Sequence, residues 1–227
     1  MLARLVKVIG LLLPLLLTAE IFMRLPRTSE LLLRETGGAQ IYQSAVLING
    51  QQGQLSTFVF YETADVIGTR LAQKLKLPRP TGNACVMLKS NGQALARYFI
   101  LNAPDFENCS IVTVLEQNTA AFRNAGRGAP PWPDNIPVLD ATATFTAVCE
   151  ETRSTFLSAL SHAATPSAAL AQAVETMRSA GWQQSVPSTP DFKIMTQKRK
   201  QCVIFTGVNP ESQNITINIL QREGAKQ

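Results

Sequence analysis

His162 is the only histidine in this sequence, so any hydrolase chemistry that needs an imidazole base depends on it. In a Ser-His-acid or Cys-His enzyme it would accept the proton of Ser158, Ser161 or Cys149, with a nearby carboxylate orienting the ring. No G-x-S-x-G motif, which exposes a nucleophilic serine on a strand-to-helix turn, supports such an arrangement. We therefore interpret His162 as a surface histidine in a loop and assign no catalytic residue.

Pairs of acids could support glycosidase chemistry without a histidine, and Glu150-Glu151 and Asp105 with Glu107 are the candidates. Adjacent acids on a strand point to opposite faces, and both pairs border predicted turns, so surface charge is the better interpretation. The sequence has no C-x-x-C motif and no pair of histidines, which disfavours a metal site. It also has no phosphate-binding glycine loop. We expect a protein that is not an enzyme and that has no metal and no cofactor.

The four cysteines fall two in each half of the chain, Cys85 and Cys109, then Cys149 and Cys202. Pairing within each half is the simplest of the three possible connectivities. If Cys85 and Cys109 lie on strands that flank a middle one, however, they are about 9.5 Å apart, and a disulfide needs Cα atoms within about 7 Å. Both a disulfide and four buried free thiols stay open.

Candidate partner contacts come from two tryptophans and one basic run. Trp132 lies in a proline-rich stretch, where it could wedge between two lobes or contact a partner, and Trp182 follows a predicted helix, under whose end it is expected to pack. Lys198, Arg199 and Lys200 are interpreted as a solvated hairpin tip, with contact to a partner or an acidic lipid as the alternative. The net charge is only +5, and this is the only dense basic cluster, so no nucleic-acid partner is predicted.

The N-terminal residues predict export. Arg4 and Lys7 precede an uncharged, leucine-rich stretch over residues 8–19, as in the charged and apolar regions of a signal peptide. That stretch is short for a membrane span, which favours cleavage, whereas the A-x-A cleavage pattern is missing and the apolar segment extends to residue 23. Residues 1–24 are therefore either a cleaved signal or an uncleaved hydrophobic helix that tethers the chain through residues 8–23. Either way, we expect the rest of the chain outside the cytoplasm, in the periplasm or secreted.

Proline, glycine and capping signals divide the remaining chain. Thr28 or Ser29 can cap a short helix that Gly37-Gly38 ends, which predicts a helical spacer over residues 25–39. A dense run of proline and glycine predicts a linker over residues 119–139. The expected folded lobes are residues 40–118 and 140–223.

The two lobes have the same predicted order of elements, strand, strand, helix, strand, strand, strand. The first helix is expected to begin after Thr63 and to bury Ala64, Ile67, Gly68, Leu71 and Leu75; the second is expected to begin at Thr165-Pro166 and to bury Leu170, Ala173, Val174 and Met177. The last strand of each lobe alternates apolar and polar residues, which favours antiparallel sheets covered on one face by the helix. We predict an α+β fold of two tandem repeats, preceded by the N-terminal hydrophobic helix.

The apolar N-terminal segment, the spacer, the paired lobes and the lack of catalytic motifs favour a non-enzymatic envelope protein. The expected function is protein binding or assembly, with another envelope protein or a second copy of the chain as partner. The alternative is a periplasmic ligand-binding module with a cleft between the lobes around Trp132. A hydrolase that uses His162 is the least favoured hypothesis.

Overall fold

The computed structural model describes residues 28–79, 84–90, 94–103, 108–120, 129–185, 192–208 and 213–224. The predicted signal or anchor (residues 1–24) and residues 121–128 of the predicted linker lie outside the described residues. Among the residues that are described, no helix is both long enough and apolar enough to cross a membrane.

The described chain forms one antiparallel sheet of eleven strands in the order β3-β4-β5-β2-β1-β6-β7-β11-β10-β9-β8. The first half of the molecule contributes β1 (Ala39–Ile48), β2 (Gln51–Phe60), β3 (Ala84–Ser90), β4 (Ala94–Asn102) and β5 (Ser110–Asn118). The second half contributes β6 (Ala141–Cys149), β7 (Ser154–Ser161), β8 (Gln183–Ser185), β9 (Phe192–Gln197), β10 (Lys200–Val208) and β11 (Ile215–Glu223). The described helices are α2 (Thr28–Glu35), α3 (Ala64–Leu75) and α5 (Pro166–Ser179). The predicted antiparallel pairing is confirmed. The described chain is mostly antiparallel sheet with three helices, and the two predicted sheets are joined into one.

The joint between the halves is built at the β1-β2 turn. Asn49 and Gly50 have φ angles of 47° and 76°, as a two-residue type I′ hairpin requires. Strand β1 then pairs with β6 through only two register pairs, Leu47 with Val148 and Ile48 with Ala147. Asn49 extends this contact, because its N–H donates to the Thr146 carbonyl (2.9 Å) and its Oδ1 accepts from the Thr146 N–H (2.8 Å). The two half-sheets therefore share an edge that is short but fully hydrogen-bonded at the turn.

The helices α3 and α5 lie where the sequence predicts them. Thr63 is the N-cap of α3, but the free Ala64 N–H donates to Asn102 Oδ1 of β4 (2.7 Å) rather than to the Thr63 side chain. Thr165 caps α5 by accepting from the Ala168 N–H, and Pro166 occupies its first turn. All the residues predicted for the buried faces of both helices are buried.

The short helix α2 packs against the first half, so residues 28–35 belong to the folded body rather than to a separate spacer. Leu33 is fully buried in the first-half core. The carboxylate of Glu30 is buried as well and accepts hydrogen bonds from three side chains of β1 and β2, namely Gln43 Nε2 (3.1 Å), Gln54 Nε2 (2.7 Å) and Ser56 Oγ (2.7 Å). Ser29 donates to Glu116 of β5. These contacts fix α2 across the strands of the first half.

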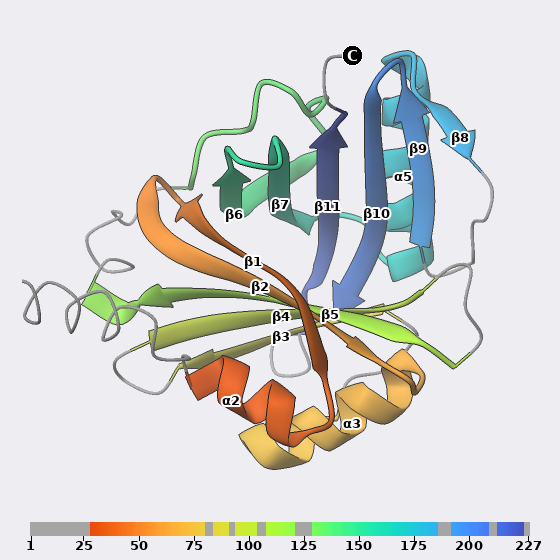
Figure 1. Cartoon of the computed structure of the whole chain (residues 1–227). Coiled ribbons are helices and arrows are strands. Elements are labelled where there is room, and N and C mark those ends of the chain that lie inside the picture. Colours follow the sequence, from red (N-terminus) through yellow and green to blue (C-terminus); the bar gives the residue numbers. More distant parts are fainter. Residues whose placement is uncertain are drawn as a thin grey trace, which may run out of the picture.

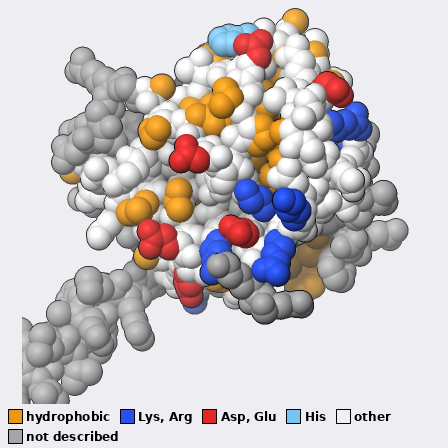
Figure 2. Space-filling view, turned by 90° about the horizontal axis from the view of Figure 1, so that it is seen from above, with side chains coloured by type: hydrophobic (Ala, Val, Ile, Leu, Met, Phe, Trp, Pro, Cys, Tyr) orange, Lys and Arg blue, Asp and Glu red, His pale blue; other side chains and the backbone are white. Residues whose placement is uncertain are grey.

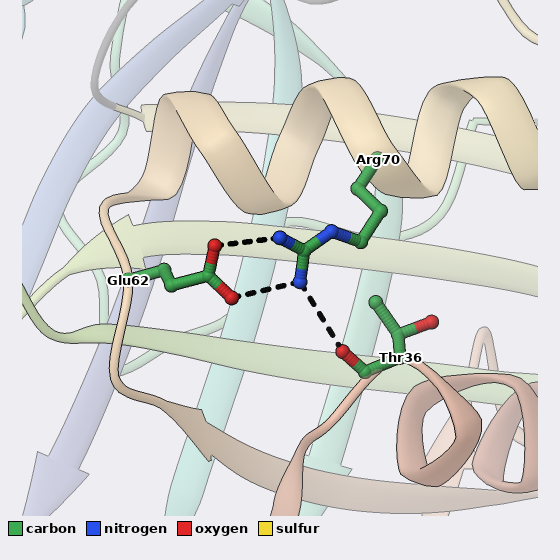
Figure 3. A network of polar contacts seen from close by, with 3 residues as sticks. All are labelled: Thr36, Glu62 and Arg70. Carbon is green, nitrogen blue, oxygen red and sulfur yellow. Dashed lines mark hydrogen bonds and ion pairs between the residues drawn. The ribbon is translucent and has the colours of Figure 1, made fainter.

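A charged clamp joins α2 and α3 on their outer side (Figure 3). Arg70 of α3 donates to both carboxylate oxygens of Glu62, at 2.7 and 2.6 Å, and to the carbonyl of Thr36 at 3.4 Å. The hydrogen bonds with Arg70 lower the pKa of Glu62 below its usual value. One guanidinium thus holds the loop before α3 and the end of α2 together.

Three apolar cores stabilise the molecule. The first lies between α2, α3 and the first half, and the second lies between α5 and the second half. The third, which we call the shared core, contains residues of both halves, namely Val46, Ile48, Leu55, Phe99, Leu115, Phe145, Ala147, Cys149, Phe156, Phe192, Ile194 and Phe205. We call the face of each half-sheet that carries these residues its inner face. Figure 1 shows the strands of the second half crossing those of the first steeply, with α2 and α3 below and α5 on the outer side of the second half.

One half folds back on the other, and β3 of the first half therefore contacts β10 of the second. A Cβ added at Gly207 of β10 would lie 3.6 Å from Cγ2 of Val86 in β3 and 3.1 Å from Thr216 Oγ1. The distance to Val86 is an ordinary van der Waals contact, so β3 and β10 touch here, and the tighter contact is with Thr216 of the neighbouring strand β11.

Candidate functional site: a cavity between the half-sheets

A cavity of about 150 Å³ lies between the inner faces of the two halves and is partly open to solvent. Its lining comes from β4 and β5 of the first half and from β7, β9, β10 and β11 of the second. The apolar lining residues are Phe99, Leu101, Ile111, Phe156, Leu157, Phe192, Ile194, Val203, Phe205, Ile219 and Leu220. Four of these (Leu101, Ile111, Val203 and Leu220) are only partly buried. The cavity is therefore an apolar space between strands that are far apart in the chain.

Phe99 forms the centre of the aromatic wall beside this cavity. Its ring centroid lies 6.3 Å from that of Phe145, 6.1 Å from that of Phe156 and 6.4 Å from that of Phe205, which it meets edge to face. Aromatic rings at these separations attract one another beyond the burial of their surface. The wall therefore joins one ring of the first half to three rings of the second and resists separation of the halves.

The polar side chains at the cavity are largely satisfied by one another. Asn218 is almost fully buried; its Oδ1 accepts from Ser158 Oγ (2.9 Å) and its Nδ2 donates to Thr216 Oγ1 (3.3 Å). Thr113 Oγ1 lies 3.3 Å from Thr57 Oγ1. An apolar cavity with so few free polar atoms holds water poorly, and cavities of about 150 Å³ lined by Leu, Ile and Phe take up benzene-sized ligands.

The residues predicted as partner contacts lie elsewhere. Trp182 is buried in the core under α5, as expected from its position after the helix. Trp132 packs against that same core and donates from Nε1 to the Ile136 carbonyl (3.0 Å), so it does not line the cavity. Lys198, Arg199 and Lys200 form the turn between β9 and β10 and the start of β10, and the first two are exposed. None of these five residues lines the cavity between the half-sheets.

The two cysteines of the second half lie on opposite faces of the sheet. Cys109, Cys149 and Cys202 are free thiols, and the side chain of Cys85 lies outside the described residues. Cys149 is buried in the shared core and Cys202 in the core under α5, so the expected pairing within the second half is not formed in this structure. Burial raises the pKa of Cys202 to about 12. Its thiol is therefore protonated at neutral pH.

Among the described residues, those considered for hydrolysis do not form a triad, and Asp105 and Glu107 lie outside the described residues. His162 is exposed in the loop before α5, while Ser158 is committed to Asn218 and Ser161 accepts from the Ala163 N–H (3.1 Å). The Glu151 carboxylate accepts from Ser44 (2.7 Å) and Tyr42 (3.3 Å), beside Cys149. Within the described part of the chain, no group of His, Cys, Asp and Glu is arranged to hold a metal ion.

The cavity residues were not predicted, although the sequence contains a signal for them. Phe99, Ile100 and Leu101 are consecutive apolar residues in a strand, and such a strand is covered on both faces. Phe99 and Leu101 face the cavity, whereas Ile100 lies in the core under α3. The signal indicates double coverage but does not say that a second half-sheet, rather than another helix, provides it.

Charged side chains on the surface are dispersed. Figure 2 shows one small group of Lys and Arg with an acidic side chain among them, on a face that is otherwise mostly uncharged or apolar.

No protein-family model, curated protein or solved structure matches the chain. A functional conclusion therefore depends on the geometry described above.

Proposed function

We propose that this protein is a non-enzymatic binding module whose ligand is a small, uncharged apolar molecule held between its two halves. The observation that carries the proposal is the cavity of about 150 Å³, which is lined almost entirely by apolar side chains and is partly open to solvent. Its volume suits a single aromatic ring or a short branched hydrocarbon group. Its residues come from both halves, so a bound ligand would stabilise the contact between them.

The test is a thermal unfolding experiment on the purified full-length protein with and without benzene as the probe. Ligand that binds only the native state raises the melting temperature, by about 3–6 °C at ten times its Kd for a chain of this size. Val203→Phe places a larger side chain in the cavity and should abolish the shift. Val208→Phe, the same change at an exposed position of the same strand, should keep it. No shift in the wild type, or equal shifts in the two variants, would contradict the proposal.

We infer further that the two halves are tandem repeats. The sheet order supports this, because β3-β4-β5-β2-β1 is mirrored by β9-β10-β11-β7-β6 about the β1-β6 joint, with β8 as an addition. The first strand of each half also carries an irregularity in register near its start, between Gln40 and Tyr42 and between Ala143 and Phe145. A superposition of the halves that failed to bring α3 onto α5 would count against duplication.

The N-terminal segment supports the proposal that the module acts outside the cytoplasm, in the periplasm or secreted, either free after signal cleavage or tethered through residues 8–23. Intact-mass measurement of protein from the membrane and soluble fractions separates the two forms. A chain that keeps its N-terminal Met and stays in the cytoplasm would exclude export.

Assembly with another envelope protein or a second copy is the second candidate. It is favoured by Leu47 and Val148, which are register partners at the joint and are 40% and 39% exposed on the face opposite the shared core. Light scattering after size exclusion should show a complex or oligomer that Leu47→Lys disrupts and Leu88→Lys, at another exposed leucine, does not. A monomer that co-purifies with no other protein would exclude this candidate.

A further inference from the structure

Arg97 is a largely buried cation, and no acidic side chain among the described residues pairs with it. It lies on β4 two residues before Phe99, so its side chain leaves the same inner face. Its guanidinium carbon lies 4.0 Å from the centre of the Phe145 ring. Burial lowers the pKa of Arg97 to about 10, which leaves the group charged at neutral pH. Among the described residues, nothing accepts a hydrogen bond from its buried Nη1.

Gln117, on the adjacent strand β5, also has buried polar atoms that lack hydrogen-bond partners among the described residues. Its side chain is fully buried, and neither amide atom has a hydrogen-bond partner within the described part of the chain. In the β4-β5 register, Leu95 pairs with Gln117 and Arg97 with Leu115, so Arg97 and Gln117 are diagonal neighbours on one face. Diagonal neighbours are about 7–8 Å apart at the backbone, so two long side chains at these positions can contact the same small group.

We propose that Arg97 and Gln117 form a binding site for a single carboxylate group. The planar guanidinium offers two parallel N–H groups that match two carboxylate oxygens, and Gln117 Nε2 supplies a third donor. One negative charge neutralises the one cation present, whereas a phosphate would bring more charge than the site balances. Buried polar groups are normally hydrogen-bonded, and the contact with Phe145 satisfies the charge only from one side.

The site is separate from the apolar cavity, since Arg97 does not line it and the Phe99 ring packs against Phe145 at its side. It is one strand from the edge of the sheet. The register partner of Arg97 on the edge strand β3 is Leu88, which is 50% exposed. The β3 edge is therefore the side from which we expect a small carboxylate to enter, and this entry does not involve the residues that line the cavity.

The test compares melting temperatures of the full-length protein at pH 7 in sodium acetate and in sodium chloride of equal ionic strength. The wild type should gain a few degrees in acetate. Arg97→Met should gain none, and in chloride it should melt no lower than the wild type because an unpaired buried charge has been removed. Arg222→Met, at an exposed arginine, should respond to acetate like the wild type.

Two further variants keep the proposal falsifiable if Arg97→Met does not fold. Arg97→Lys keeps the charge over Phe145 but not the parallel donors, and Gln117→Leu removes the third donor; both should lose most of the acetate effect. Equal acetate gains in the wild type and these variants, or no gain in the wild type, would overturn the site. Val203→Phe should keep the acetate effect, so failure of the cavity and failure of this site are distinguishable.

Discussion

Arg70 connects two segments of the first half through one exposed guanidinium. Its two hydrogen bonds to Glu62 leave both partners more than a third exposed, at 38% and 40%. Solvent screens such a pair, so its contribution to stability is modest at physiological salt. Its position matters more than its strength, because the third contact, to the Thr36 carbonyl, attaches α3 to the end of α2.

The Glu62 carboxylate makes stability depend on pH. Its pKa is lowered by the hydrogen bonds with Arg70, so its stabilising contribution is present above the ordinary value of 4.5 and is lost as the pH falls through the lowered pKa. Glu62→Gln should therefore be slightly less stable than the wild type at pH 7, and the difference should vanish in acid. Urea unfolding at pH 7, 4.5 and 3 measures this, with the exposed Glu35→Gln as control. A difference that stayed constant with pH would show that the charge is not involved.

At the scale of elements, α2 shows that contacts with the sheet decide which side of a short helix is buried. Three consecutive leucines predict a helix but do not show which of them faces inward. In the structure Leu33 is fully buried, whereas Leu31 is 46% exposed. The difference arises from the docking of α2 on strands β1, β2 and β5 through Glu30 and Ser29.

Truncation of these two leucines tests whether α2 is part of the cooperative fold. Leu33→Ala leaves a cavity in the first-half core and should lower the free energy of unfolding by about 2–5 kcal/mol. Leu31→Ala should change it by less than about 0.5 kcal/mol, since the side chain is half exposed. Denaturant unfolding of both variants gives the values, and equal small effects would mean that α2 is a detached spacer.

Elements were predicted better than their contacts. The α3 and α5 faces and the Thr165 cap follow from local periodicity and capping chemistry, which act within a few residues. The Asn102 cap of α3, the short strand β8 and the β1-β6 joint were not predicted, because each depends on residues that are distant in the sequence. The cavity was not predicted for the same reason, because its two walls meet only when the halves fold onto each other.

At the scale of the whole molecule, Asn49 connects the two halves at the β1-β6 joint. Its left-handed φ of 47° suits the turn, and its side chain and main chain both bond to Thr146 of the other half. Asparagine tolerates this conformation better than most residues. Asn49 therefore performs a local and a long-range function at once.

Substitutions separate these two functions. Asn49→Gly keeps the turn but leaves the Thr146 N–H without its acceptor, which should cost about 1–2 kcal/mol. Asn49→Ala adds a strained left-handed residue, for a total of about 2–4 kcal/mol. Asn49→Asp keeps both the acceptor and the turn and should stay close to the wild type. Thermal unfolding ranks the three variants. An Asn49→Gly protein as stable as the wild type would show that the hydrogen bond from Thr146 to the Asn49 side chain does not stabilise the joint.

The arrangement of the halves also determines what a partly synthesised chain exposes. Every strand of the first half lies within residues 39–118, so that half can pair its own strands before residues 141–223 emerge. Until then Phe99, Ile48 and Leu115 of the shared core lack the residues of the second half that cover them. Refolding should pass through an intermediate that binds an apolar dye and aggregates when concentrated. Stopped-flow refolding with the dye would reveal it, and a fluorescence trace without a transient rise would show that both halves fold together.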